Sequence, residues 1–81
     1  MELWFCHPCT IAAVNDDTSG MSDEQELLTN KGLERLGFIY ADFNQFEQGK
    51  SVGIHEEVVD KCDCCTTTSI GDRYRFWDGN D

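Results

Sequence analysis

Cys6-His7-Pro8-Cys9 near the start of the chain and Cys62-Asp63-Cys64-Cys65 near its end contain every cysteine of the sequence. In each stretch, the first and the last cysteine are separated by two residues. Each stretch also follows a segment that predicts a β-strand, so that a tight turn can aim both sulfurs of a pair inward. Two such pairs supply four soft thiolates in a tetrahedral array, which is typical of a structural zinc site. The spacing therefore predicts a zinc site formed by Cys6, Cys9, Cys62 and Cys65.

The remaining cysteine and the two histidines need separate interpretations. Cys64 cannot be a fifth ligand in a tetrahedron, so it either replaces Cys62 or Cys65 or stays beside the cluster, and we expect the last of these. We also expect His7 to point outward from the first pair and His55 to lie on the surface of a strand. Iron in a rubredoxin-like cage uses the same four thiolates, and the sequence does not separate iron from zinc.

Length and charge limit the kind of protein. At 81 residues, we expect a single domain over residues 1–81 with a modest core, and natural domains of this size often add a metal or disulfides. The chain has 16 acidic residues against 6 lysines and arginines, which gives a formal net charge of −10. This charge argues against direct binding to nucleic-acid phosphates and favours a basic protein surface as the partner.

The sequence also suggests a compartment. The first five residues lack the basic start and the apolar segment of a secretory signal, so we expect none. The longest apolar runs, at residues 3–6 and 11–14, are far shorter than the roughly 20 residues that cross a bilayer. An odd number of cysteines without export features fits a reducing cytoplasm, where close cysteine pairs more often ligate metals. We expect a cytoplasmic protein without a membrane span, as a monomer or a small homo-oligomer.

One long helix is predicted from Ser22 to about Leu36. Ser22 and Gln25 have the capping-box spacing, acidic residues follow Ser22 in the first turn, and Gly37 fits the C-terminal cap. At 100° per residue, one face of this helix can pack while Leu27 lies off it. The residues of the packing face are Leu28, Thr29, Gly32, Leu33 and Leu36.

The other elements are shorter. Strands are predicted at residues 2–5, 38–41 and 72–77, helical turns at 10–14, and a further extended segment at 51–59. Phe43 and Phe46 are expected core contacts. These elements predict a small α+β, zinc-ribbon-like domain in which one main helix packs on a small antiparallel sheet.

The first cysteine pair has a second interpretation. Cys6-His7-Pro8-Cys9, after a strand and before a helix, looks like the dithiol motif of thioredoxin-like and glutaredoxin-like proteins, in which a helix N-terminus lowers the pKa of the first thiol. Those families also have a cis-proline facing the dithiol, whereas Pro8 is the single proline of this chain and lies inside the motif. A zinc site is therefore the preferred interpretation.

The polar segment after the first pair has the ligand spacing of a calcium-binding EF-hand loop from Asn15 to Glu26, with Gly20 at its sixth position. Its first residue is Asn instead of Asp, and the preceding segment contains Pro8 and two expected zinc ligands where an EF-hand has a helix. A loop that leads into a capped helix explains the same residues and is preferred.

The whole pattern resembles small uncharacterised proteins encoded by tailed bacteriophages. The resemblance covers most of the chain and rests on the two cysteine pairs, the polar segment 15–20, the leucine-bearing helix and residues 71–76. In those proteins the two pairs look like a zinc-ribbon-like site, and a glycine commonly follows the second pair where this chain has Thr66. The resemblance implies a metal site at the same four cysteines and an accessory role inside the host, and it brings no enzymatic activity.

These observations lead to one expected function and two alternatives. We expect a non-enzymatic, acidic, zinc-binding accessory protein that binds and modulates a basic host protein of transcription, replication or defence. The alternatives are a dithiol redox protein that uses Cys6 and Cys9, and an acidic inhibitor that mimics DNA.

Overall fold

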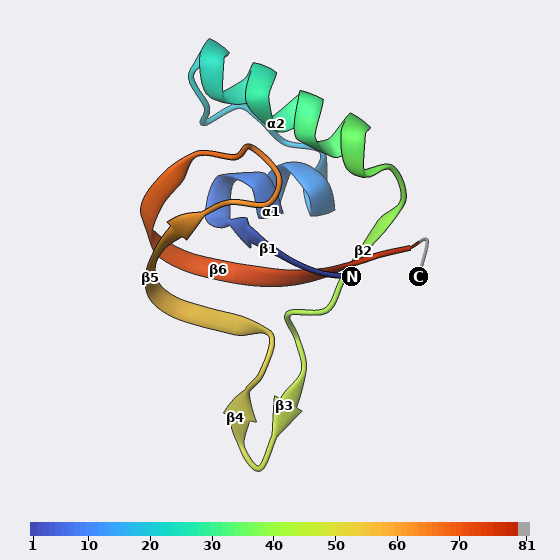
Figure 1. Cartoon of the computed structure of the whole chain (residues 1–81), viewed down its shortest axis with the longest axis vertical. Helices are drawn as coiled ribbons and strands as arrows, with labels where there is room; N and C mark the ends of the chain where they lie inside the picture. The colour runs from blue at the N-terminus through green and yellow to red at the C-terminus, as the bar shows by residue number, and fades with distance from the viewer. Residues whose placement is uncertain (80–81) are drawn as a thin grey trace.

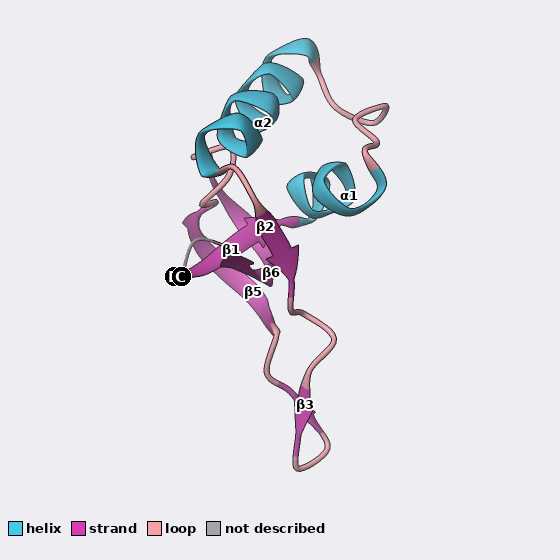
Figure 2. Ribbon diagram, turned by 90° about the vertical axis from the view of Figure 1, so that its right-hand side faces the viewer, coloured by secondary structure: helices cyan, strands magenta, loops and turns pink. Residues whose placement is uncertain are grey.

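Two helices and six strands form within residues 1–79, the part of the chain that the computed structural model describes (Figure 1). In chain order they are β1 (Glu2–Cys6), α1 (His7–Asn15), α2 (Asp23–Leu36), β2 (Ile39–Ala41), β3 (Phe46–Glu47), β4 (Lys50–Ser51), β5 (Ile54–Lys61) and β6 (Thr68–Asp78). Both helices lie on the same side of the main sheet (Figure 2). This arrangement confirms the predicted α+β class.

The long strand β6 organises the main sheet, because it pairs antiparallel with three other strands. Residues 73–77 of β6 pair with β1, in a register that places Leu3 beside Phe76 and Cys6 beside Arg73. Along the other edge of β6, residues 68–74 pair with β5 and residues 76–78 pair with β2. The strand predicted at 72–77 is therefore longer than expected, because β5 continues the ladder toward its beginning.

Ser22 and Gly37 cap α2 at the predicted positions. The Ser22 hydroxyl accepts a hydrogen bond of 3.2 Å from the backbone N–H of Gln25, and Gly37 ends the helix with a φ of 72°. The other helix, α1, begins three residues earlier than predicted, because Cys6 serves as its N-cap and Pro8 lies in its first turn, where proline is tolerated. Within residues 1–79, neither helix has the length and apolar character needed to span a bilayer.

The core between the sheet and the helices contains few large apolar side chains. Leu3, Phe5 and Phe76 are almost fully buried, and the rings of Phe5 and Phe76 stack with 4.4 Å between their centroids. All five cysteines are buried in the same cluster. Since full burial of a large apolar side chain contributes only about 1.5–3 kcal/mol, a core with so few of them needs an additional source of stability.

A small hairpin between β2 and β5 was not predicted. Strands β3 and β4 pair with each other through a tight turn in which Gln48 and Gly49 have φ values of 53° and 80°, as a type I′ turn requires. This hairpin extends away from the helices (Figure 2). Phe43 packs against the core as expected, but Phe46 is 68% exposed, so its assignment to the core is wrong.

Candidate metal centre

The first cysteine pair lies at the junction between β1 and α1. Cys6 ends the strand with extended backbone angles and is the N-cap of the helix, and Cys9 follows within the first helical turn. The Thr10 hydroxyl donates a hydrogen bond of 3.0 Å to the Cys6 carbonyl and holds this turn. Both sulfurs consequently face the core, where Cys6 is 8% exposed and Cys9 is fully buried.

The second pair lies in the tight turn between β5 and β6. The N–H of Thr66 donates to the Cys62 carbonyl at 2.9 Å and closes the turn. The turn is also attached to β1, because Asp63 and Trp4 exchange two hydrogen bonds, one from the Trp4 N–H to the Asp63 carboxylate at 2.8 Å and one from the Asp63 N–H to the Trp4 carbonyl at 3.0 Å. The two ends of the chain thereby bring their cysteines together.

The four cysteines selected by spacing lie in one group. Their sulfur atoms are all within 4.8 Å of one another, and all four residues are buried. The Sγ atoms of Cys6 and Cys65 are 4.0 Å apart, close to the roughly 3.8 Å that a tetrahedral site with metal–sulfur bonds of about 2.3 Å requires. The cysteines are free, without disulfides. Their arrangement can hold one soft metal ion and supplies four ligands to it.

The electrostatics of the group favour a thiolate at Cys62. Hydrogen bonds from the Cys6 and Cys9 thiols lower the pKa of Cys62, and the backbone N–H of Cys6 also donates to its sulfur at 3.3 Å. The pKa of Cys6 is raised, chiefly by its hydrogen bond to Cys62. The bond from Cys6 lowers the pKa of Cys9, but bonds to Cys62 and Cys64 together with burial outweigh it and raise this pKa. Because the thiolate is the ligand form, a bound cation would displace the shared protons.

Cys64 stands beside this group, as expected, and has another contact. Its thiol donates to the backbone carbonyl of Thr29 in α2 at 3.5 Å, and its N–H donates to the Cys62 sulfur at 3.4 Å. The fifth cysteine therefore joins α2 to the turn that carries the second pair.

Sequence reasoning missed the polar contribution of α2 to this region. The Arg35 guanidinium donates to the carbonyls of Asp63 at 2.9 Å and Cys64 at 3.4 Å, and Thr29 is fully buried against Cys9. The sequence did contain a signal for the contact of Thr29. This polar residue lies at the centre of an otherwise apolar helical face, and a buried hydroxyl needs a hydrogen-bond partner.

Thr66, the residue directly after the second cysteine pair, has a left-handed backbone with a φ of 65°. This region is unfavourable for a β-branched residue. We expect Thr66→Gly to raise the free energy of unfolding by about 1 kcal/mol, because it relieves this strain. Thermal unfolding of the metal-loaded protein measures the change. A lower melting temperature for Thr66→Gly than for the unaltered chain would contradict the expectation.

Both histidines lie outside the cysteine group. His7 is exposed, with its ring 5.8 Å from that of Tyr74, and His55 lies on β5 and stacks on Trp4 at 3.8 Å. Neither histidine offers a ligand atom to the cysteine group.

The dithiol motif is buried. Reactive cysteines are usually partly exposed, so the burial of Cys6 and Cys9 argues against a freely accessible redox pair.

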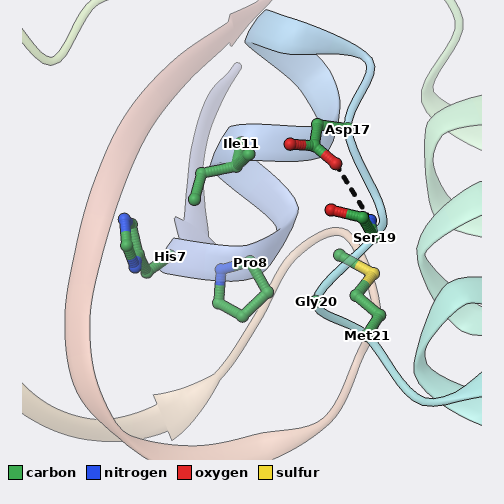
Figure 3. A pocket seen from close by; sticks show the side chains of 7 residues that line it. All are labelled: His7, Pro8, Ile11, Asp17, Ser19, Gly20 and Met21. Carbon is green, nitrogen blue, oxygen red and sulfur yellow. Dashed lines mark hydrogen bonds between the residues drawn. The ribbon is translucent and has the colours of Figure 1, made fainter.

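The loop that resembles an EF-hand adopts a different local structure. This loop and the start of α1 line a pocket of about 340 Å³ (Figure 3). There the Asp17 carboxylate accepts a hydrogen bond from the backbone N–H of Ser19, and His7 lies apart from both residues. The Glu26 carboxylate accepts from the Thr18 hydroxyl, and Gly20 is not among the residues with positive φ. Within residues 1–79, the acidic side chains here form no ligand group like that of the cysteines.

Comparisons of this chain with protein-family models, with curated proteins and with solved structures gave no match.

Proposed function

We propose that this chain is a non-enzymatic protein-binding domain that is stapled by one zinc ion and uses its acidic surface to bind a basic protein. The group of four buried sulfurs carries the proposal, because it offers a metal four ligands and leaves no coordination position for a substrate. Such a closed site is typical of structural zinc. Cys6 and Cys9 would hold the metal from the β1–α1 junction, and Cys62 and Cys65 from the β5–β6 turn.

Zinc would make up for the small core. Structural zinc in small domains has apparent binding energies of about 10–16 kcal/mol, and this energy is linked to folding because the unfolded chain has no preformed site. In this chain the metal would join the two ends of the sequence, which are separated by more than fifty residues between Cys9 and Cys62.

The distribution of charged side chains on the surface supports the binding of a basic protein. In residues 1–79, every Asp and Glu is exposed or half-buried, whereas two of the three arginines, Arg73 and Arg75, are withdrawn from the surface. Arg73 is 2% exposed and donates to the carbonyls of Asp60 and Ser69, and Arg75 pairs with Asp42 at 2.8 Å. The exposed cations of the described residues are Lys31, Arg35, Lys50 and Lys61. A surface more acidic than the net charge indicates attracts a basic partner and repels nucleic acid.

Native mass spectrometry of protein purified under reducing conditions tests the metal site. We expect one zinc ion per chain, which is lost only when the protein is denatured in the presence of a chelator, because the ligands are buried. A mass without metal, together with thiols that react readily and cycle with a reductant, would replace the zinc site by a dithiol redox pair at Cys6 and Cys9.

Charge reversal on the acidic surface tests whether the partner is a basic protein. We propose, from the resemblance to phage proteins, that the partner is a basic host protein of transcription, replication or defence. A partner isolated with the tagged chain from the host should bind the purified domain more weakly as salt rises. Replacing exposed Glu56 and Glu57 by lysine should lower the association rate, whereas the control Lys50→Glu should not. Binding that is insensitive to both salt and charge reversal would contradict an acidic docking surface.

A further inference from the structure

Two polar side chains of α2 reach toward the first cysteine pair. The Thr29 hydroxyl oxygen is 3.4 Å from the Cys9 sulfur, and Thr29 is fully buried. One helical turn earlier, the Gln25 amide nitrogen is 3.2 Å from the same hydroxyl oxygen and 3.9 Å from the Cys9 sulfur. Gln25 and Thr29 therefore form a short polar chain that ends on Cys9.

The direction of the Gln25 side chain departs from the local rule. In a capping box, the side chain three residues after the N-cap turns back to the N-cap backbone N–H. Here Ser22 accepts from the Gln25 backbone N–H as in a capping box, but the Gln25 amide donates to Thr29 and Cys9. The helix thus gives up one capping contact for a contact to a cysteine, and such departures from local consistency are expected at functional sites.

The chemistry of the groups fixes the direction of the hydrogen bonds once a metal is bound. A metal-bound Cys9 is a thiolate, which only accepts, so the Thr29 hydroxyl must donate to it. The same hydroxyl can accept the amide N–H of Gln25 on its lone pair. The Gln25 amide then donates to the Thr29 hydroxyl, and the Thr29 hydroxyl donates to the negatively charged Cys9 thiolate.

We infer that Thr29, held in place by Gln25, is a positioning residue of the metal centre that orients Cys9 and stabilises its thiolate. This inference rests on the proposed zinc site. Partners of metal ligands in other proteins contribute a factor of about 10–100 to metal affinity, because they fix the orientation of the ligand and modify its charge. The helix α2 is in this way a part of the metal centre although it supplies no ligand.

Substitution of Thr29 tests this role. Thr29→Val keeps the shape of the side chain and removes the hydroxyl, and we expect it to lower zinc affinity about 10–100-fold in competition with a chelator. Thr29→Ser keeps the hydroxyl and should stay within about threefold of the unaltered protein. With Co²⁺ as a spectroscopic probe, Thr29→Val should also shift the sulfur-to-cobalt charge-transfer bands, because the electron density on the Cys9 sulfur changes.

The matched control is Thr18→Val. Thr18 is half-buried, and its hydroxyl donates to the Glu26 carboxylate and contacts no cysteine, so its loss should leave the cobalt bands unchanged. Equal zinc affinity and identical cobalt spectra for Thr29→Val and the unaltered protein would overturn the role of Thr29, as would equal losses in Thr29→Val and Thr29→Ser. Absence of metal in the unaltered protein would instead overturn the zinc site, and this inference with it.

Discussion

Replacement of Cys65 by serine is expected to abolish metal binding and unfold the domain, whereas replacement of Cys64 by serine should leave one metal ion bound. The two cysteines are adjacent and both are buried, but only the Cys65 sulfur belongs to the group of four. A serine hydroxyl is a poor ligand for zinc, so Cys65→Ser leaves three thiolates and an incomplete tetrahedron. Native mass spectrometry measures the metal, and circular dichroism measures the loss of folded structure.

Cys64→Ser is the control for the general effect of changing a buried cysteine. A serine at this position can still donate to the Thr29 carbonyl that the Cys64 thiol contacts at 3.5 Å. We therefore expect a loss of about 1 kcal/mol or less in the free energy of unfolding, with one metal ion retained. Retention of metal by Cys65→Ser together with its loss in Cys64→Ser would show that Cys64 is the fourth ligand.

The size of the expected effect follows from the composition of the core. Within residues 1–79, the buried apolar cluster consists of five cysteines and few larger side chains, mainly Leu3, Phe5 and Phe76. Metal–thiolate bonds would therefore supply much of the energy that larger domains obtain from apolar burial. A domain built in this way has little stability to lose before it unfolds.

Much of this arrangement could be predicted from the sequence, because its signals are local. The spacing of the cysteines selected the four sulfurs that the structure brings together. The capping signals at Ser22 and Gly37 gave the bounds of α2 to within one residue, because each acts through hydrogen bonds to its own helix. The helical period correctly placed Thr29 and Gly32 on the buried face and Leu27 on the exposed one.

The features that were missed depend on contacts between distant parts of the chain. The β3–β4 hairpin turns outward from the sheet, and aromatic composition alone could not show that Phe46 would leave the core with it. Gln25 has the sequence of an ordinary capping residue, and only the approach of Cys9 in the folded chain gives its side chain another partner. Arg35 likewise finds the carbonyl of Asp63, twenty-eight residues away.

Substitution of Gly32 by alanine is expected to have the second large effect. A Cβ atom at this position would lie 2.0 Å from the Cys64 carbonyl oxygen and 2.6 Å from its carbonyl carbon. These are backbone atoms of the turn that carries the second cysteine pair, so they cannot move aside as the end of a flexible side chain does. Relief of the clash requires α2 to shift away from the turn, which would break the contacts of Thr29 and Arg35 with it.

We expect Gly32→Ala to lower the free energy of unfolding by about 3 kcal/mol or more, although alanine is the better helix former by about 1 kcal/mol. Gly20→Ala is the matched control, because a Cβ at Gly20 would meet no atom within 4 Å. Chemical denaturation of the metal-loaded variants measures both changes. A Gly32→Ala variant as stable as the unaltered chain would mean that α2 does not pack this closely on the cysteine turn. In that case the contact of Thr29 with Cys9 would lose its structural basis, since the same helix position sets both distances.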